Sequence, residues 1–578
     1  MLSWAKFYGL SMMKDVSIVV MIRRVSLLTL VLILLSSSTF PSNATFTVPD
    51  DLPIADDIVY QTIVDGGAFG NDAFSWIQAS VLPNRTTGLG GSNHLCTSFD
   101  DENCRSKDAI FGHIVLPPCS ATVRVGCIDG LEVGKSSSTL KPASLLFQGV
   151  GDQKVQASPR ASVPAGGAVS LWRSEGMGDY LVLANITYQL SKGQEKAFIS
   201  NFQANLIPTS YIQDSKYIAP SMIQVQDGDK TNITWNNRGQ NLAPMNRDCL
   251  LVTDGYCFSR EEFQEGTQAK LALRVPNDVT GWLFGRMKTP TIDVRAIDSN
   301  NNLLTVEATS TFVPNLIGSA PKSQVPSNPG LLKWAQSFFY PGDGFLERNL
   351  AAKGSWGGHS SGTNKLEIFT WWGEALKAYG GRDKRFGTSS RWMFGSTSMF
   401  EYSNQCFADK TKLIGLVTTN APFYESGPPK LVDGALNYVV AGPHHLADGK
   451  TLFKGIYDLS IRSEAARCIY NFTEAPLRAE VSVTASDGST QDVAVEAMTE
   501  RNGWIHLGAY NFHFSSPTVK VKFVQDKVVA TPTASSPKKK DAPLVVSKPR
   551  KSTSVTCIKG NTKKKFAAEK CPKGYKKS

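Results

Sequence analysis

The sequence lacks the short motifs by which metal sites and thiol redox centres are usually recognised. No Cys-x-x-Cys spacing occurs among its ten cysteines, which argues against zinc ribbons and thioredoxin-like chemistry. The seven histidines include no His-x-His or His-Glu-x-x-His, and the adjacent pair His444 and His445 would point to opposite faces of a strand. We therefore predict neither a metal site nor a cofactor.

Long apolar runs are also scarce. The run near the N-terminus, Val25 to Leu35, follows two arginines and rises only ~16 Å as a helix, against a hydrocarbon layer of ~30 Å. With the small and polar residues that follow, up to Ala44, it has the pattern of a secretory signal peptide. We expect residues 1–44 to be cleaved on export; an uncleaved anchor that recruits Val16 to Ile22 is the alternative, and the only route by which we expect the chain to meet a membrane.

Excess charge is missing from the body of the chain, although the formal net charge is +11. Thirteen lysines and one arginine against two carboxylates give Ser536 to Ser578 a charge of +12, residues 1–44 carry +3, and the remainder carries −4. Any anionic partner should therefore bind the tail, and in an exported protein that partner is a cell-wall or surface polymer rather than nucleic acid. The candidate polyanion-binding residues are Lys538, Lys539, Lys540, Lys563, Lys564, Lys565, Lys573, Lys576 and Lys577.

The cysteines are even in number, which in an exported chain predicts structural disulfides. The expected pairs are Cys96 with Cys104, Cys119 with Cys127, Cys249 with Cys257, Cys406 with Cys468, and Cys557 with Cys571. If Ala121 to Val125 were one extended strand, Cys119 and Cys127 would lie ~26 Å apart, and crossed pairing with Cys96 and Cys104 would be required. Local pairing is favoured, and the crossed alternative stays open.

Short runs of Val, Ile, Thr and Tyr, bounded by Gly, Pro, Asn and Asp, fill the chain after residue 45 and predict a mainly β protein of tandem antiparallel sandwich-like domains with few helices. We place domains at 45–200 and 201–314, a proline-containing linker at 315–329, and an aromatic-rich segment with a third domain at 330–525. A disordered linker at 526–553 and a Cys- and Lys-rich tail at 554–578 follow.

Three local features are specific enough to test. Cys249 and Cys257 flank an Asp-Gly turn and should face each other across a hairpin. Lys365 to Tyr379 could form one of the few helices, and the clustered aromatics from Leu331 to Phe400 are better explained by core packing than by a sugar-stacking platform. Alternation through Leu413 to Gln525 predicts an antiparallel meander with one wet face.

One stretch has the letters of a catalytic motif. Gly358 to Gly362 reads G-x-S-x-G around Ser360, and Asp433 and His445 follow in the order of an α/β-hydrolase triad. The preceding residues are not apolar and the chain shows no βα alternation, so we do not expect these three residues to act together. Paired carboxylates for glycoside cleavage leave no sequence motif and stay an alternative.

Around Gly281 to Arg286, Ala466 to Phe472 and the tail from Cys557, the sequence resembles uncharacterised secreted proteins of actinobacteria. The resemblance implies a β-rich cell-envelope protein and brings no known activity. We predict a secreted, cell-surface-associated protein with a non-catalytic adhesive or structural role. Its basic tail is expected to bind an anionic cell-wall or surface polymer, and carbohydrate is a second candidate ligand. The alternative is a secreted hydrolase acting on polysaccharide.

Overall fold

The computed structural model describes most of the chain between residues 57 and 525 and three short segments of the tail. The described ranges are 57–64, 73–81, 92–149, 155–227, 230–236, 249–336, 345–354, 356–361, 385–397, 405–407, 409, 411–425, 427–446, 450–473, 477–484, 490–492, 495–514, 518–525, 555–559, 562–566 and 576–577. The predicted signal peptide, the linker at 526–553 and the helix at Lys365 to Tyr379 lie outside these residues. Contacts divide the chain into two units, at Asp526/Lys527.

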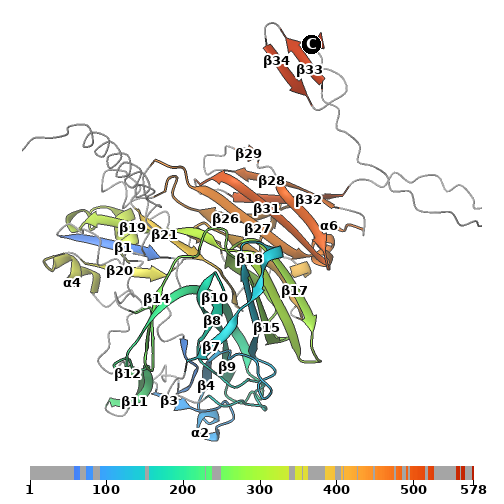
Figure 1. Cartoon of the computed structure of the whole chain (residues 1–578). Coiled ribbons are helices and arrows are strands. Elements are labelled where there is room, and N and C mark those ends of the chain that lie inside the picture. Colours follow the sequence, from blue (N-terminus) through green and yellow to red (C-terminus); the bar gives the residue numbers. More distant parts are fainter. Residues whose placement is uncertain are drawn as a thin grey trace, which may run out of the picture. The chain divides into compact units, whose positions relative to one another are not determined.

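The described chain is mainly β, as the short alternating runs predict. The larger unit is built on one extended sheet of 15 strands (Figure 1). Along its main path lie β3 (Ser92–Cys96), β2 (Trp76–Val81), β4 (Ala109–Val115), β9 (Gly178–Ser191), β10 (Phe198–Gln213), β22 (Met393–Thr397), β16 (Gly281–Arg286), β23 (Leu413–Thr419), β27 (Lys454–Arg462), β31 (Trp504–His513) and β30 (Val495–Arg501). Four further strands join it beside β9 and β10, namely β7 (Ser144–Gln148), β8 (Ser170–Ser174), β13 (Leu251–Thr253) and β14 (Tyr256–Arg260). Its pairs are antiparallel except β16 with β23.

Two smaller antiparallel sheets cover opposite faces of this large sheet. The five-stranded sheet contains β17 (Lys288–Ala296), β18 (Asn301–Thr309), β15 (Gln268–Pro276), β5 (Cys127–Gly134) and β6 (Lys141–Pro142). The six-stranded sheet contains β24 (Phe423–Tyr424), β26 (Ala435–Ala441), β32 (Thr518–Gln525), β28 (Leu477–Thr484), β29 (Thr490–Asp492) and β25 (Lys430–Val432). The centre of the large sheet is therefore shared by two sandwiches.

Strand β23 contributes side chains to both sandwiches. Every one of its residues is buried, because alternate side chains enter different cores. Leu416 belongs to the core formed with Leu271 of the five-stranded sheet, whereas Val417 belongs to the core formed with Val521 of the six-stranded sheet. A continuous apolar run of this kind is what a strand covered on both faces requires.

A four-stranded sheet, a two-stranded ribbon and four α-helices complete the described part of the larger unit. The sheet contains β20 (Trp356–Ser361), β1 (Ile58–Val64), β19 (Thr311–Pro321) and β21 (Arg385–Arg391), and the ribbon contains β11 (Ser221–Asp227) and β12 (Lys230–Asn236). The helices are α2 (Glu102–Arg105), α3 (Pro329–Gln336), α4 (Phe345–Ala351) and α6 (Ser463–Tyr470). Val59 and Ala320 of the sheet share a core with Trp334 of α3 and Leu346 of α4.

The predicted linker at 315–329 is wrong. Residues up to Pro321 continue β19, Lys322–Gln324 form a 3-10 turn, and Pro329 begins α3. The prolines that suggested a linker occupy a strand end and a helix start, two places where a missing N–H costs little. The boundary expected at residues 200 and 201 likewise falls inside β10, and strands from all three predicted domains pair in the large sheet.

The predicted meander also needs correction. The turn at Asn502 and Gly503 is formed, and it joins β30 to β31 in the large sheet. Strands β28, β29 and β32 instead belong to the six-stranded sheet, which faces β31 across a core. Alternation indicates that a strand has one buried face, but it does not say which sheet the strand joins.

The tail unit contains a small antiparallel sheet of its own. Its strands, in the order β34–β33–β35, are β34 (Thr562–Phe566), β33 (Val555–Lys559) and β35 (Lys576–Lys577). Cys557 is paired with Lys564 on one side and with Lys577 on the other. The register therefore gathers cationic positions from two segments of the tail around one strand.

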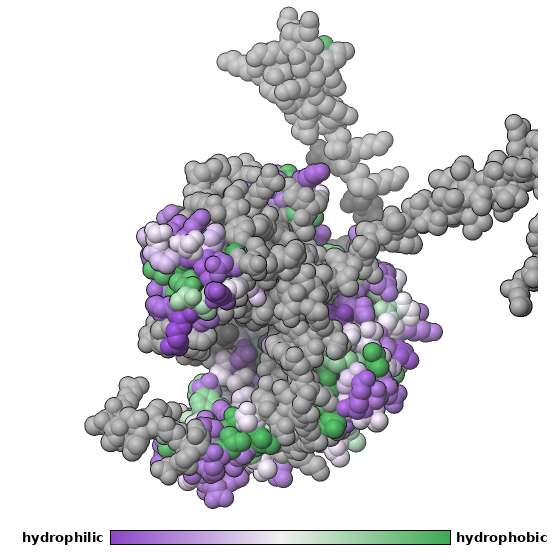
Figure 2. All heavy atoms as spheres, turned by 90° about the vertical axis from the view of Figure 1, so that its left-hand side faces the viewer, coloured by the Kyte–Doolittle hydropathy of each residue, from purple (hydrophilic) through white to green (hydrophobic). Residues whose placement is uncertain are grey.

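No helix among the described residues is long and apolar enough to cross a membrane. On the face drawn in Figure 2, the described surface intersperses hydrophobic residues among hydrophilic ones. Exposed large hydrophobic residues, such as Leu145 on β7 and Ile212 on β10, occur on several separate strands. Scattered exposure of this kind is normal for a folded protein surface and needs no partner.

Candidate functional site

A charged pocket of about 240 Å³ lies at one end of the large sheet, where three segments meet. It is lined by the short helix α2, the turn between β9 and β10, and a loop that contains Arg160. Asp101 caps α2 by accepting a hydrogen bond from the Asn103 amide at 2.9 Å, and the Cys96–Cys104 disulfide ties the helix to β3. These constraints fix the position of Arg105, the last residue of α2, in the lining of the pocket.

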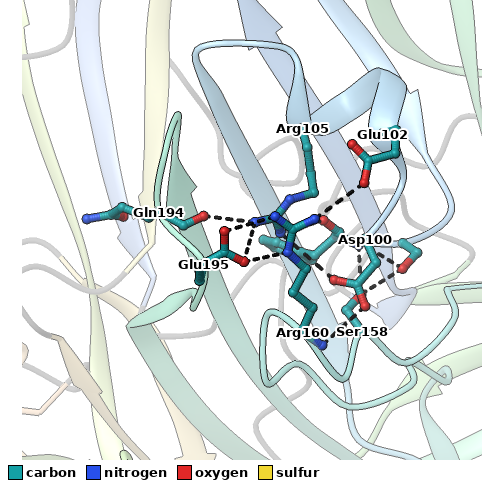
Figure 3. Close-up of polar contacts among 9 residues, drawn as sticks. Asp100, Glu102, Arg105, Ser158, Arg160, Gln194 and Glu195 are labelled. Atoms are coloured by element: carbon teal, nitrogen blue, oxygen red, sulfur yellow. Dashed lines mark hydrogen bonds and ion pairs between the residues drawn. The ribbon is translucent and has the colours of Figure 1, made fainter.

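Two arginines organise the pocket (Figure 3). Arg105 donates from Nη2 to the Gln194 carbonyl at 2.9 Å and from Nη1 to the Phe99 carbonyl at 3.3 Å, so it joins the β9–β10 turn to the chain before α2. Arg160 forms a bidentate pair with Glu195, in which Nη2 lies 2.9 Å from Oε1. Its Nη1 also lies 3.3 Å from Glu102.

Glu195 is held in the ionised form. The hydrogen bond from Arg160 lowers the pKa of Glu195, with further lowering from the charges of Arg160 and Arg105. The hydrogen bond that Arg160 donates to Glu195 in turn raises the pKa of Arg160. A general acid for glycoside cleavage needs the opposite shift, since it must keep its proton near neutral pH. The pocket is therefore built to hold fixed charges rather than to transfer a proton from Glu195.

Sequence reasoning missed this pocket. Arg105, Arg160 and Glu195 come from separate segments and form no motif, because the contact between them is made by the fold. The short separation of Cys96 and Cys104 predicts a disulfide across the loop between them. Nothing in the sequence indicates that this loop faces Arg160.

A second concavity, of about 420 Å³, lies where the turns at Pro276 to Asp278 and at Asn300 to Asn301 approach the loop from Ala157 to Pro164. Its walls carry amide, hydroxyl and proline side chains, together with Lys196 and the carboxylate of Asp278. Such groups suit polar ligands, although most of them face solvent.

A buried polar cluster lies between β17 of the five-stranded sheet and the strands β27 and β31. Asp458 accepts hydrogen bonds from the Tyr510 hydroxyl and, at 3.2 Å, from the Thr289 amide. Ser460 Oγ lies 2.8 Å from His506 Nδ1. The aspartate contacts the tyrosine rather than the histidine, and Asp458 and Ser460 are 3% and 1% exposed, so substrate cannot reach them. Burial raises the pKa of Asp458 to about 7, against the smaller effect of the Tyr510 hydrogen bond.

The structure places the three triad candidates on separate elements. Ser360 lies inside β20, paired with Ile63 of β1, rather than on a turn leading into a helix as a nucleophile elbow requires. Asp433 occupies the tight turn between β25 and β26 with φ of 50°, and His445 forms an isolated bridge with Leu452. No group of three or more His, Cys, Asp or Glu side chains suited to a metal ion occurs in the described part of the chain.

The four disulfides whose cysteines are described have the locally favoured pairing: Cys96–Cys104, Cys119–Cys127, Cys249–Cys257 and Cys406–Cys468. Cys571, the partner expected for Cys557, lies outside the described residues. Four disulfides indicate that the protein folds in an oxidising environment, such as the cell exterior.

Local geometry explains two of these pairs. The Cα atoms of Cys119 and Cys127 are 5.0 Å apart, because the chain between them turns at Ser120 to Val123 instead of extending as a strand. Around the Asp254–Gly255 turn, Val252 rather than Cys249 lies opposite Cys257. The hairpin prediction is confirmed, but Cys249 reaches its partner from outside the paired strand.

The aromatic-rich segment serves core packing where it is described. Trp334, Trp392 and Phe394 are almost fully buried, as the interpretation of these aromatics as core residues requires. Trp356 lies on β20 without a described side chain, and Trp371 and Trp372 lie outside the described residues.

Of the predicted polyanion-binding lysines, Lys563, Lys564 and Lys565 lie on β34, and Lys576 and Lys577 form β35. Lys538, Lys539, Lys540 and Lys573 lie outside the described residues.

In comparisons with known proteins, no family model, no curated protein and no solved structure matches this chain.

Proposed function

We propose that this protein is exported and retained at the cell surface by its basic tail, where the β-sheet body has a non-catalytic adhesive or structural role. The observation that carries the proposal is the segregation of charge. The segment from Ser536 to Ser578 has a formal charge of +12, whereas Thr45 to Ser535 carries −4. The tail, Lys527–Ser578, is also a separate contact unit.

Two further features support this reading. The small sheet of the tail brings Lys564 and Lys577 to either side of Cys557, which concentrates positive charge in one place. Several weak contacts acting together can then hold an anionic surface polymer, and each lysine near an anionic surface contributes about 1 kcal/mol.

The hydrolase alternative receives no specific support. It needs a cleft with one carboxylic acid and one carboxylate. In the charged pocket, Glu195 is held ionised by Arg160. Asp458, a buried acid with a raised pKa, is sealed between sheets.

Deleting Ser536 to Ser578 tests the proposal. We expect the shortened protein to move from the cell fraction to the medium, because the cations that hold it are gone. A sharper pair of variants replaces Lys538–Lys540 and Lys563–Lys565 either by glutamine or by arginine. A tenfold change in affinity corresponds to ~1.4 kcal/mol, and the loss of two lysine contacts at about 1 kcal/mol each already exceeds that. The loss of six charges in the glutamine variant should therefore weaken retention by far more than tenfold. The arginine variant keeps the charges and should preserve retention. Equal retention of all variants, measured by cell-fraction immunoblots over a range of salt, would exclude the tail as the anchor.

A further inference from the structure

Arg391 is a buried cation whose guanidinium is only partly satisfied. It is the last residue of β21, lies opposite Thr311 of β19, and is 4% exposed. Its Nε and Nη2 atoms have no hydrogen-bond partner among the described residues. Buried arginines are ordinarily paired, because an isolated charge inside a protein loses its hydration without compensation.

The chemistry of arginine makes this arrangement informative. A guanidinium does not lose its proton in a protein, so Arg391 cannot escape the cost of burial by becoming neutral. The Nε–H and Nη2–H groups project from the same edge of the planar guanidinium. That edge is the fork that receives two oxygens of a carboxylate, phosphate or sulfate in a bidentate pair.

The surroundings of the fork are polar. Paired residues of neighbouring strands share a face, so Thr311 lies on the same face as Arg391, as does Ser389 two residues earlier. The Asn315 side chain bonds Ser389 Oγ at 3.0 Å on that face. Thr311, Asn315 and Ser389 are all at most 3% exposed. Ser389 Oγ donates in turn to Asn315 Oδ1 at 3.1 Å, so its proton is already used, and Thr311 is the hydroxyl expected to assist in binding an oxyanion.

The strand is also fixed on its opposite face. Ser390 donates its amide to Glu262 Oε2 at 2.6 Å and accepts the Phe263 amide at 2.7 Å. Trp392 donates from Nε1 to the Ala308 carbonyl at 2.9 Å. These contacts on both sides of Arg391 keep β21 from rotating its side chain into solvent.

We propose that the Arg391 fork, with Thr311 opposite it on β19, is the binding site of a small oxyanion with two coplanar oxygens. Inorganic phosphate and the carboxylate of a small acid share this chemistry. The site belongs to the larger unit and is independent of the tail, so it goes beyond surface retention.

Isothermal titration of the full chain with sodium phosphate and, separately, with sodium acetate tests the site, at ionic strength matched with sodium chloride. We expect saturable one-site heat with at least one oxyanion, and the response to phosphate against acetate tells which class is preferred. Near saturation the melting temperature should rise by about 2–4 °C relative to chloride. Absence of both signals in the wild-type protein overturns the proposal.

Variants assign the signal to the fork. Arg391→Lys keeps the charge but not the paired donors, and should weaken binding at least tenfold. Thr311→Val keeps Arg391 and the local shape, and should weaken binding less. Arg295→Gln is the matched control, because that arginine is exposed and already paired with Asp293 at 3.1 Å. Heat that persists in Arg391→Lys, or is lost in Arg295→Gln, would place binding elsewhere and also overturn the proposal.

Discussion

Replacing Asp458 by asparagine should remove a pH-dependent loss of stability from this protein. The carboxyl group is fully enclosed between β17 and the strands β27 and β31, where it accepts hydrogen bonds from Tyr510 and Thr289. When protonated, it can donate to the Tyr510 oxygen while its other oxygen still accepts from the Thr289 amide. An asparagine side chain offers the same donor and acceptor, so Asp458→Asn mimics the protonated state.

The magnitude follows from the shift in pKa. Burial raises the pKa of Asp458 from 3.8 to about 7 in the folded protein. Between these values the folded state binds a proton that the unfolded state has released, so stability falls as pH rises through this window and is constant above it. A difference of about three pKa units, at ~1.4 kcal/mol per unit, lowers the free energy of unfolding by on the order of 4 kcal/mol by pH 8. The Asp458→Asn variant has no carboxyl group at this position, so its free energy of unfolding should not show this decrease.

Urea denaturation followed by tryptophan fluorescence at pH 5 and pH 8, without reductant, measures the effect. The variant should gain several kcal/mol over the wild type at pH 8 and much less at pH 5. Glu175→Gln, in the exposed turn between β8 and β9, is the control and should follow the wild type at both pH values. Parallel pH dependence in wild type and Asp458→Asn would show that the buried carboxyl does not titrate in this range, and would refute the reasoning.

Three other changes have clear expected outcomes. Replacing Cys406 and Cys468 by serine removes a cross-link that closes 62 residues, and should lower the free energy of unfolding by about 4 kcal/mol, measured by urea denaturation without reductant against the disulfide-bonded wild type. Gly415→Ala would place a Cβ atom into the ring of Trp282, and overpacking of this kind costs about 1–3 kcal/mol; an unchanged melting temperature would contradict the packing described. Asn502 has φ of 53° in a two-residue hairpin turn, so Asn502→Val should destabilise by about 1 kcal/mol or more while Asn502→Gly should be nearly neutral, as thermal melts would show.

How far the sequence predicts the fold can be seen from particular strands. The alternation from Leu271 to Val275 predicts strand β15, and the Asn502–Gly503 pair predicts the hairpin between β30 and β31, because both signals depend on residues close together in the chain. The all-buried β23 gave no alternation, since it is covered on both faces. Which sheet a strand joins depends on partners hundreds of residues away, as in the pairing of β10 with β22.

The same distinction applies to the candidate sites. The basic tail was predictable because charge adds up along a contiguous segment, whatever the fold. The pocket of Arg105, Arg160 and Glu195 was not, because its ion pairs join residues from three segments. Arg391 looks like any other strand arginine in the sequence, and its burial is visible only in the structure.

The sequence by itself determined that this is a mainly β, disulfide-linked protein with its positive charge confined to one end, because composition, alternation and cysteine spacing are local or additive properties. Only the tertiary structure decided that one sheet runs through all the predicted domains, that the Cys119 to Cys127 segment turns, and that Asp458 and Arg391 are buried. The physical reason is that burial and strand partnership are set by contacts between distant segments, and such contacts leave no regular spacing along the chain.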